Sequence, residues 1–227
     1  MSKNVRNDLL NYNLKIVQNN NFFKFSLDSV MLAEFVKIDK KDKTLLDLCT
    51  GNAPLPMILS SRVNNIVAVE LQNEIYEMAK ESILINKITN IKLIEDNVKN
   101  IKNYFPGNNF DIVTCNPPYF KYHEDSKINE KKVKAFARHE IEIKLAEIVE
   151  IAYNNLRNKG KFYLVHRAER LIEIIDIFNE IGFGIKRVQI VYYNSSKECS
   201  MILLEAKKNS KHNVKIVKPL FTENYGR

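Results

Sequence analysis

The chain lacks tryptophan and is poor in glycine, proline and cysteine, and these shortages exclude several classes of protein. Its 227 residues include six Gly, six Pro and three Cys. So little Gly and Pro excludes a collagen-like or low-complexity chain. The cysteines, Cys49, Cys115 and Cys199, are too few and too scattered for a disulfide framework or a zinc motif, so we predict no metal site.

Long apolar runs are also absent from the sequence. No stretch approaches the roughly 20 residues that span a bilayer, and the polar start Met-Ser-Lys-Asn offers no signal-peptide core. Scattered cysteines are typical of a reducing compartment. We therefore predict a cytoplasmic protein without a membrane partner, and no sequence feature indicates an obligate protein partner.

The chain carries an excess of positive charge. Lys and Arg number 35 against 27 Asp and Glu, which gives a formal net charge of +8. Such an excess favours a polyanionic partner such as nucleic acid, through long-range attraction and counterion release. The sequence is also rich in Asn, Lys and Ile, as AT-rich coding DNA would make any protein. Charge alone therefore leaves both interpretations open.

Short β-branched runs alternate with longer amphipathic stretches from Thr44 onward, which is typical of a mostly parallel sheet. The predicted helices cover 54–61, 72–86, 141–156 and 167–180, and Gly182 ends the last. Seven strands are predicted, at 44–49, 66–70, 91–95, 110–115, 161–165, 185–190 and 200–206. The last two have no room for a crossover helix between them and should pair antiparallel. The predicted fold class is α/β, a doubly wound, Rossmann-like sheet of seven strands with the last one antiparallel.

A short extension precedes this sheet. Residues 14–17 and 22–25 are predicted to form a β-hairpin, and Asp28 to cap a helix that follows it. We therefore expect three parts, which are an N-terminal extension of hairpin and helix (1–43), the main α/β domain (44–207) and a basic C-terminal tail (208–227).

The turn after the first predicted sheet strand is a candidate cofactor loop. The run Asp47-Leu-Cys-Thr-Gly-Asn52 lies where open α/β sheets bind ligands, beyond the carboxyl end of a strand. Gly51 lets a ligand approach the backbone closely, but Cys49 and Ala53 occupy two places where nucleotide-binding loops usually carry glycine. The loop alone also fits an ordinary strand-to-helix turn.

Acidic residues end the next two predicted strands. Glu70 ends the second predicted strand of the sheet, where a carboxylate can accept from both hydroxyl groups of a ribose. Asp96 and Asn97 follow the third, where Asp96 can accept from an adenine amino group. Either acid alone fits a solvated strand end. Their placement at consecutive strand ends is what indicates a cofactor that contains adenosine.

The most specific motif is Asn116-Pro117-Pro118-Tyr119, at the end of the fourth predicted strand. Two prolines remove two backbone donors and leave carbonyl acceptors without a competing N–H. The side-chain oxygen of Asn116 and the carbonyl of Pro117 can then hold one planar NH2 group for in-line attack on a sulfonium methyl, while Tyr119 stacks on the substrate. A rigid turn is the alternative interpretation.

These motifs resemble those of class I methyltransferases that modify amino groups, whose fourth motif reads Asp/Asn-Pro-Pro-Tyr/Phe. Together with Phe23-Lys-Phe-Ser-Leu-Asp-Ser-Val-Met-Leu-Ala33 and Ala137-Arg-His-Glu140, they are similar to the bacterial tRNA1(Val) adenine-37 N6-methyltransferase family. The resemblance implies S-adenosylmethionine as the methyl donor and a methyltransferase domain over 44–207. It also implies an adenosine next to the anticodon, at position 37 of a tRNA, as the target.

The resemblance also assigns roles to single residues. The residues implied to line the cofactor are Asp28, Asp47, Cys49, Gly51, Asn52, Glu70, Asp96, Asn97 and Asn116. The residues implied to take part in catalysis are Asn116, Pro117, Pro118 and Tyr119. Cys49 and Ala53 depart from the glycines of the family loop and add side-chain bulk near the methionine moiety.

A segment rich in cations and aromatics follows the Asn-Pro-Pro motif. A base in a folded anticodon loop must be splayed out, and basic contacts can offset that cost. The predicted substrate contacts are Tyr119, Phe120, Lys121, Lys131, Lys132, Lys134 and Arg138, all to the anticodon stem-loop. A solvated loop is the alternative, and Arg138-His139-Glu140 equally fits a helix cap.

Three other functions stay open at this point. A protein glutamine N5-methyltransferase uses the same Asn-Pro-Pro-Tyr chemistry, although that family carries a substantial helical N-terminal domain and only residues 1–43 precede the first sheet strand here. A ribosomal RNA methyltransferase of exocyclic amines is the second. The third, a non-catalytic RNA-binding module, would have no need of the intact acceptor motif and strand-end acids.

Overall fold

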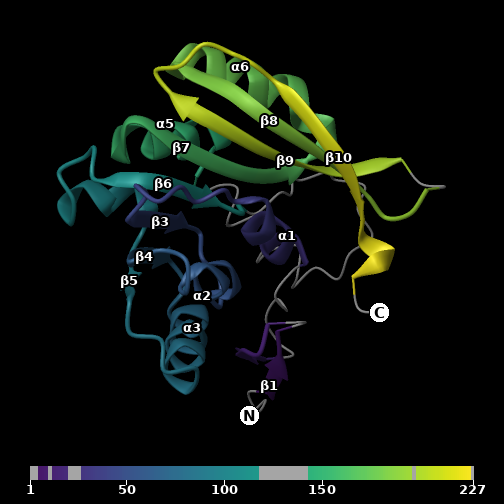
Figure 1. The fold of residues 1–227 in the computed structure, drawn as a ribbon. Coiled ribbons are helices and arrows are strands. Elements are labelled where there is room, and N and C mark those ends of the chain that lie inside the picture. Colours follow the sequence, from purple (N-terminus) through teal and green to yellow (C-terminus); the bar gives the residue numbers. More distant parts are fainter. Residues whose placement is uncertain (1–4, 10–11, 20–26, 118–142, 196–197, 226–227) are drawn as a thin grey trace, which may run out of the picture.

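The computed structural model describes residues 5–9, 12–19, 27–117, 143–195 and 198–225, and every structural statement below refers to these residues. They form an eight-stranded sheet and a separate two-stranded hairpin. Helices cover both faces of the larger sheet (Figure 1). The predicted α/β class is confirmed. In the described part of the chain, no helix is long and apolar enough to cross a membrane.

The large sheet has a doubly wound order. Across the sheet the strands are β10 (Lys215–Phe221), β8 (Phe183–Tyr192), β9 (Cys199–Lys208), β7 (Leu156–Arg167), β6 (Phe110–Cys115), β3 (Thr44–Leu48), β4 (Asn65–Glu70) and β5 (Ile91–Glu95). All neighbours are parallel except β9, which runs antiparallel to β7 and β8 as predicted. The chain order reverses between β3 and β6. Ligands of open α/β sheets bind beyond the carboxyl ends of the strands at such a point.

Successive residues of the central strands are buried on opposite faces of the sheet. Leu45 packs in the core beneath α1, α2 and α3, whereas Leu46 packs in the core beneath α5 and α6. In β4, Ile66 likewise packs in the core with Leu45, and Val67 packs in the core with Leu46. A strand buried on both faces has a continuous apolar run, which is why these strands were predictable from sequence. The helices are α1 (Leu27–Phe35), α2 (Pro54–Leu59), α3 (Asn73–Ile85), α5 (Leu145–Asn155) and α6 (Leu171–Ile181), with 3-10 turns η1 (Val98–Asn103), η2 (Ala168–Arg170) and η3 (Thr222–Asn224).

The predicted strands are all present, and their ends differ by a few residues. The largest difference is at β7, which begins at Leu156, directly after α5. Residues 157–159 are polar and exposed, so the sequence offers no apolar signal for this part of the strand. Gly182 has a φ of 100° and ends α6, as predicted, because glycine adopts this left-handed conformation without strain.

The N-terminal hairpin is present, but its pairing differs from the prediction. β2 (Lys15–Gln18) pairs with β1 (Val5–Asp8), which precedes it in the chain. The predicted partner, residues 22–25, lies outside the described residues. Asp28 is the second residue of α1 and lies in its first turn, so it does not occupy the predicted capping position. A carboxylate there still interacts favourably with the helix dipole.

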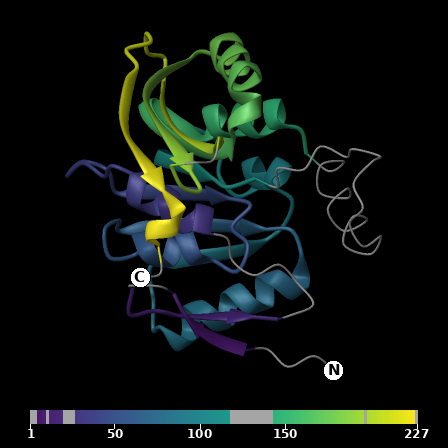
Figure 2. The same ribbon diagram turned by 90° about the vertical axis from the view of Figure 1, so that its right-hand side faces the viewer.

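The hairpin lies along α3, as Figure 2 shows. The Lys15 N–H donates to Asn86 Oδ1 at 2.8 Å, and Asn86 Nδ2 donates to the Lys15 carbonyl at 2.6 Å. Two residues further along β2, the Val17 N–H donates to Ser82 Oγ at 2.9 Å. Ser82 of α3 and Asn86, which caps the C-terminus of that helix, therefore satisfy the β2 backbone on the side that faces away from β1.

β10 was not predicted from sequence, which indicated a basic tail over 208–227. Residues 215–221 instead extend the sheet as an edge strand parallel to β8. Pro219 hid the strand, because proline cannot donate in a ladder and is tolerated only on edge strands, and the register shifts at this point. To reach that edge the chain crosses β8 at Gly184, where a Cβ would collide with the Ser210 carbonyl oxygen.

Candidate functional site

The loop after β3 follows a glycine-rich path although it contains one glycine. Cys49, Gly51 and Ala53 have φ values of 57°, 61° and 68°, so alternate residues are left-handed. This conformation costs an L-residue other than glycine roughly 1–2 kcal/mol. The Thr50 N–H donates to the Val69 carbonyl at 2.9 Å and helps to hold the loop in this form. The backbone of a nucleotide-binding loop is thus kept despite the substitutions at positions 49 and 53.

Asp47 lies beneath this loop and organises it. Its two carboxylate oxygens accept from the Thr50 hydroxyl at 2.5 Å and from the Thr114 hydroxyl of β6 at 2.6 Å. The side chain is buried, with 2% of its surface exposed. Burial raises the pKa of Asp47 to about 7, against the lowering effect of the two hydroxyl groups. Asp47 therefore joins β3, the loop and β6, and a direct contact between its side chain and a cofactor stays a prediction.

Replacing Asp47 by Asn should flatten the pH dependence of stability. The folded chain holds the Asp47 proton up to about pH 7, whereas an unfolded chain releases it at about pH 4. Between these values the unfolded state binds fewer protons, so stability falls as pH rises, by up to about 1.4 kcal/mol per pH unit, and the contribution is level above this window. Urea unfolding of both proteins across the window measures the difference. Parallel stability curves would show that Asp47 does not titrate there.

Glu70 joins the loop to the end of β4. One carboxylate oxygen accepts from the Gly51 N–H at 2.8 Å and the other from the Gln72 N–H at 3.0 Å. The side chain is only 5% exposed. A carboxylate has about four lone-pair directions and can accept from ribose hydroxyl groups while it also holds backbone donors. The predicted partners Gly51 and Glu70 are thus brought together.

Asp96 follows β5 at the same edge of the sheet. Its backbone N–H donates to the Glu70 carbonyl at 3.1 Å. Hydrogen bonds from Asn100, then Tyr104 and the Asn97 N–H, hold the pKa of the Asp96 carboxyl below its usual value. Asp96 is therefore an ionised acceptor one strand away from Glu70, as an adenine amino group would require.

Three residues predicted to line the cofactor have structural partners that the sequence did not suggest. Asn97 Oδ1 accepts from the Lys99 N–H at 3.0 Å and caps η1. Asn52 is buried, and its Nδ2 donates to the Val17 carbonyl of β2 at 3.0 Å. Cys49 lies beside Cys115, whose thiol pKa is raised by burial and by that neighbour. A cofactor contact of these residues, and of Asp28, stays a prediction.

Asn116 directly follows β6, which is paired with β3, the strand that leads into the cofactor loop. The register pairs Leu48 of β3 with Cys115 of β6, so the carboxyl ends of the two strands lie next to each other. Asn116 is half-buried, and its Nδ2 donates to Ser29 Oγ of α1 at 2.8 Å. Pro117 is buried. The other predicted residues of this part, Pro118, Tyr119, Phe120, Lys121, Lys131, Lys132, Lys134 and Arg138, lie outside the described residues.

Several contacts at this edge were not predicted from sequence. Thr50 and Thr114 hold Asp47, Tyr104 and Asn100 hold Asp96, and Ser29 holds Asn116. Sequence could have suggested Thr50, which lies in the predicted cofactor loop, and Thr114, which stands two residues before Asn116 in a buried strand. The contacts of Asp96 depend on the turn that follows β5, and the contact between Asn116 and Ser29 depends on how distant parts of the chain pack.

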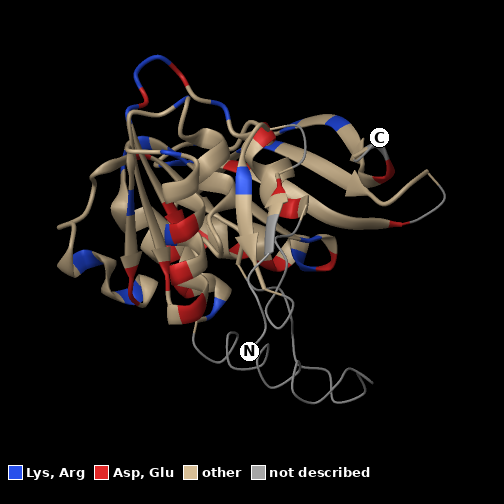
Figure 3. Ribbon diagram, turned by 90° about the horizontal axis from the view of Figure 1, so that it is seen from below, with Lys and Arg blue, Asp and Glu red and all other residues tan. Residues whose placement is uncertain are grey.

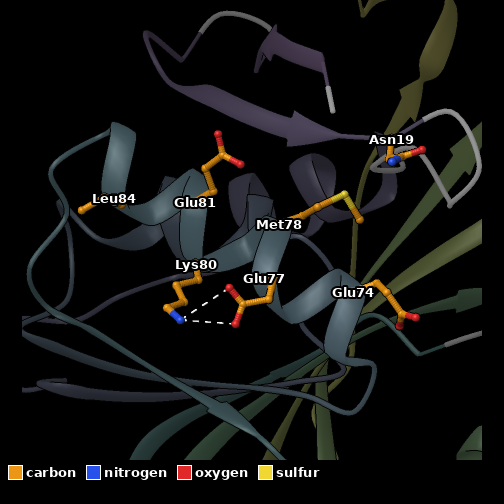
Figure 4. A pocket seen from close by; sticks show the side chains of 7 residues that line it. All are labelled: Asn19, Glu74, Glu77, Met78, Lys80, Glu81 and Leu84. Carbon is orange, nitrogen blue, oxygen red and sulfur yellow. Dashed lines mark hydrogen bonds and ion pairs between the residues drawn. The ribbon is translucent and has the colours of Figure 1, made fainter. Parts of the chain in front are cut away.

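A separate pocket of about 420 Å3 lies beside α3 and is not built from the predicted residues. Figure 4 shows its lining of Asn19, Glu74, Glu77, Met78, Lys80, Glu81 and Leu84. Lys80 pairs with Glu77 at 3.2 Å. Three carboxylates repel a phosphate backbone, so this pocket does not suit RNA. In the part of the chain that the structure describes, no cluster of His, Cys, Asp and Glu could hold a metal ion.

The edge formed by β3, β4, β5 and β6 fits an adenosine-containing cofactor. A Cβ on Gly51 would meet no atom within 4 Å, so the loop backbone faces open space. Glu70, which contacts Gly51, and Asp96, which follows the next strand, supply acceptors for the donors of the ribose and adenine of such a cofactor. These carboxylates also suit the positive charge of a sulfonium group.

Comparison with known proteins agrees with this geometry. The model of the family described as methyltransferase small domain matches residues 14–182. Two proteins named tRNA1(Val) (adenine(37)-N6)-methyltransferase are similar to this chain. The one from Cytophaga hutchinsonii is 26% identical over 200 residues, 87% of this chain and 82% of that protein, and the one from Aliivibrio salmonicida is 25% identical over 79% and 75%.

A solved structure shares the fold. The crystal structure of a predicted O-methyltransferase from Agrobacterium tumefaciens superposes with a TM-score of 0.68 at 19% identity, covering 88% of this chain and 89% of that one. The left-handed loop, the strand-end acids and Asn116-Pro117 lie within residues 14–182, which the family model matches. The chain therefore belongs to the methyltransferase small domain family.

Proposed function

We propose that this chain transfers a methyl group from S-adenosylmethionine to the N6 amino group of an adenosine at position 37, next to the anticodon, of a tRNA such as tRNA1(Val). The observation that carries the proposal is the position of Asn116 and Pro117, which follow β6 next to the loop that holds Gly51. An amine acceptor thus adjoins a cofactor loop at the switch in strand order. The named relatives agree with an adenosine in tRNA.

The chain's own residues act on the amine by orientation. The nitrogen of an adenine NH2 group is a poor nucleophile, because its lone pair is delocalised into the ring. Acceptance of its two hydrogens by Asn116 Oδ1 and the Pro117 carbonyl turns that lone pair toward the methyl donor, and alignment of this kind is a large part of the catalysis. S-adenosylmethionine supplies a methyl group on a positively charged sulfur. After transfer, the extra proton on nitrogen is acidic enough to pass to water.

The cofactor side of the site rests on Glu70 and Asp96. Glu70 would accept from the ribose hydroxyl groups, and Asp96 from the adenine amino group. Glu70 also holds the Gly51 N–H, so the residue that would bind the ribose fixes the loop that would contact the rest of the cofactor. The proposal places the reaction in the cytoplasm, where tRNA is found.

The test is methylation of competing substrates in parallel. Purified protein is incubated with labelled S-adenosylmethionine and, separately, total tRNA, ribosomal RNA and a translation release factor. We expect label in tRNA alone, with N6-methyladenosine as the labelled nucleoside. Label in the release factor would support a protein glutamine N5-methyltransferase instead, and label in ribosomal RNA would support a ribosomal RNA methyltransferase. Absence of label from all three would reject the proposal.

The basic segment after Asn116 is proposed to bind the RNA backbone. The lysines of this segment, Lys131, Lys132 and Lys134, lie outside the described residues. On the described part of the chain, acidic and basic residues are interspersed (Figure 3). Replacing the three lysines by Ala should weaken tRNA binding and lower the slope of log K against log salt by about 0.7–0.9 per lost phosphate contact. Filter binding at several salt concentrations measures this slope. An unchanged slope would remove the segment from the interface.

A further inference from the structure

We infer that Tyr193 stacks on an unpaired base of the RNA substrate, at a nucleotide other than the target adenosine. The inference rests on the proposed function, since it names a further contact of the same RNA. Tyr193 directly follows β8 and is 59% exposed. Among the exposed large apolar side chains of the described residues, Tyr104 and Tyr193 are the aromatic ones. The Tyr104 hydroxyl is bound to Asp96, whereas no described side chain bonds to the Tyr193 hydroxyl or stacks on its ring.

Tyr193 lies at the edge of the sheet that carries the proposed amine site. β9 runs antiparallel to both β7 and β8, so β8 runs parallel to β7, and β6 and β10 run in the same direction. Figure 1 shows the end of β10 and the turn after β8 together on its right-hand side. The carboxyl ends of strands with one direction share one edge of a sheet, where ligands bind. Tyr193 and Asn116 therefore lie at the same edge.

The strand order gives the separation between Tyr193 and Asn116. β8 is the third strand from β6, across β7 and β9, which corresponds to about 14 Å at about 4.8 Å per strand. β8 also reaches further out, because Val191 is level with Arg167 of β7, which lies three residues beyond the partner of Cys115. The combined separation is about 15–20 Å. Stacked nucleotides repeat at about 3.4 Å, so Tyr193 would meet a neighbour of the target base.

The backbone that carries Tyr193 is held in place. Its carbonyl accepts from the Glu223 N–H at 3.1 Å and from the Thr222 hydroxyl at 3.4 Å. One residue earlier, the rings of Tyr192 and Phe221 stack with their centroids 5.7 Å apart and join the ends of β8 and β10. A ring on a fixed backbone loses little freedom on binding, so most of its stacking energy contributes to affinity.

The charge beside Tyr193 suits the face of a base better than a phosphate group. Glu223, whose N–H holds the Tyr193 carbonyl, is exposed. A carboxylate repels the RNA backbone, whereas stacking on an aromatic ring needs only the flat face that every base has. Unpaired bases in the loop of a folded RNA present such faces, and paired bases in a helix do not. The surface therefore suits the loop of an RNA stem-loop.

The first test is removal of the ring. We expect Tyr193→Ala to raise the Kd of an anticodon stem-loop RNA by about 5- to 100-fold, the usual effect of removing a stacking aromatic residue. Tyr193→Phe keeps the ring and should stay within about twofold. The Kd of S-adenosylmethionine and kcat at saturating RNA should also stay within about twofold, because the lost contact is made to RNA in the ground state and the transition state alike.

The salt dependence of binding separates stacking from charge. Stacking on a base releases no counterions, so Tyr193→Ala should leave the slope of log K against log salt unchanged. The lysine variants of the basic segment should lower that slope, which makes them the contrasting case. Filter binding at several salt concentrations measures both the affinity and the slope. A lower slope in Tyr193→Ala would assign the lost affinity to phosphate contacts and overturn the inference.

Ile216→Ala is the matched control. Ile216 is 72% exposed and is the second residue of β10, at the opposite end of that strand from Phe221. Both substitutions shorten one large exposed side chain, but Ile216 lies away from the carboxyl edge. Its replacement should leave the Kd of the RNA unchanged. Equal losses in the two variants would mean that position at the edge does not matter, which contradicts the inference.

The absence of tryptophan from the chain allows the contact to be observed directly. Tyr193→Trp introduces a single indole at the proposed contact, and stacking on a base should quench its fluorescence as the stem-loop RNA is added. Ile216→Trp places the indole at the other end of β10 and should keep its fluorescence. A duplex RNA without unpaired bases should quench neither variant. This titration requires no turnover.

The inference fails on any of three further results. They are an unchanged Kd in Tyr193→Ala, a loss in Tyr193→Phe as large as in Tyr193→Ala, and unquenched fluorescence of Tyr193→Trp at saturating RNA. Failure of the proposed function has a different signature. The unchanged protein would then methylate none of the RNA substrates, and the fluorescence titration would still decide whether residue 193 stacks on RNA.

Discussion

Asn116→Ala is expected to lower the rate of methyl transfer by about 10²- to 10³-fold, the usual effect of removing one preorganised hydrogen-bonding group from a reacting centre. The amine then loses the acceptor that turns its lone pair toward the methyl donor. The affinity for S-adenosylmethionine should change by less than about fivefold, because Glu70 and Asp96 lie on other strands and keep their own partners. Single-turnover rates with tRNA, together with calorimetry of cofactor binding, measure the two effects separately.

Asn109→Ala is the matched control for this substitution. Asn109 precedes β6 at the opposite end of the same strand, and its Nδ2 donates to the Gly107 carbonyl at 2.7 Å. It should leave the rate of methyl transfer unchanged. Loss of the fold or of cofactor binding in Asn116→Ala would instead show that Asn116 is structural, since its contact with Ser29 also joins β6 to α1.

Glu70→Gln is expected to weaken binding of S-adenosylmethionine by about 10- to 100-fold. A hydrogen bond to a charged acceptor contributes about 1.5–3 kcal/mol, and the amide removes the charge and one acceptor oxygen. The substitution also brings a donor NH2 group to a place where the Gly51 and Gln72 N–H groups already point. Calorimetric titration with S-adenosylmethionine measures the loss, and saturating cofactor should restore much of the rate.

Glu95→Gln provides the control, because Glu95 is the register partner of Glu70 on the next strand. Its carboxylate is exposed and accepts from Asn73 Nδ2 at 3.0 Å. Both substitutions remove one negative charge from the same edge of the sheet. Equal loss of cofactor affinity in the two variants would attribute the effect to overall charge, and no loss in Glu70→Gln would move the ribose site elsewhere.

Much of the fold could be predicted from sequence because the central strands are buried on both faces. Runs such as Ile66-Val-Ala-Val69 are apolar throughout, so they could be recognised as buried strands without any alternation of apolar and polar residues. The pairing of β2 and the existence of β10 could not be predicted in this way. β10 lies on an edge, is largely exposed and contains Pro219, and β2 is fixed by Ser82 and Asn86 of a helix far along the chain.

The candidate site, too, could be predicted only in part. Glu70, Asp96 and Asn116 were predictable because each follows a recognisable strand, and parallel strands bring their carboxyl ends to one edge. The contacts that hold them were not predictable, since Ser29 and Asn116 are 87 residues apart. The left-handed loop was concealed by Cys49 and Ala53, whose side chains suggest an ordinary turn although the backbone keeps the path of a glycine loop.

The two bonds of Val17 make the N-terminal extension part of the working unit. Its N–H donates to Ser82 of α3 and its carbonyl accepts from Asn52 of the cofactor loop, so one residue of β2 bridges two parts of the main sheet domain. A shortened chain that began at β3 would lack Ile16 and Val17, both fully buried, would expose the core residues that pack with Ile16, and would release the loop from one of its supports. A fusion junction or protease site intended to leave the enzyme intact therefore belongs ahead of β1.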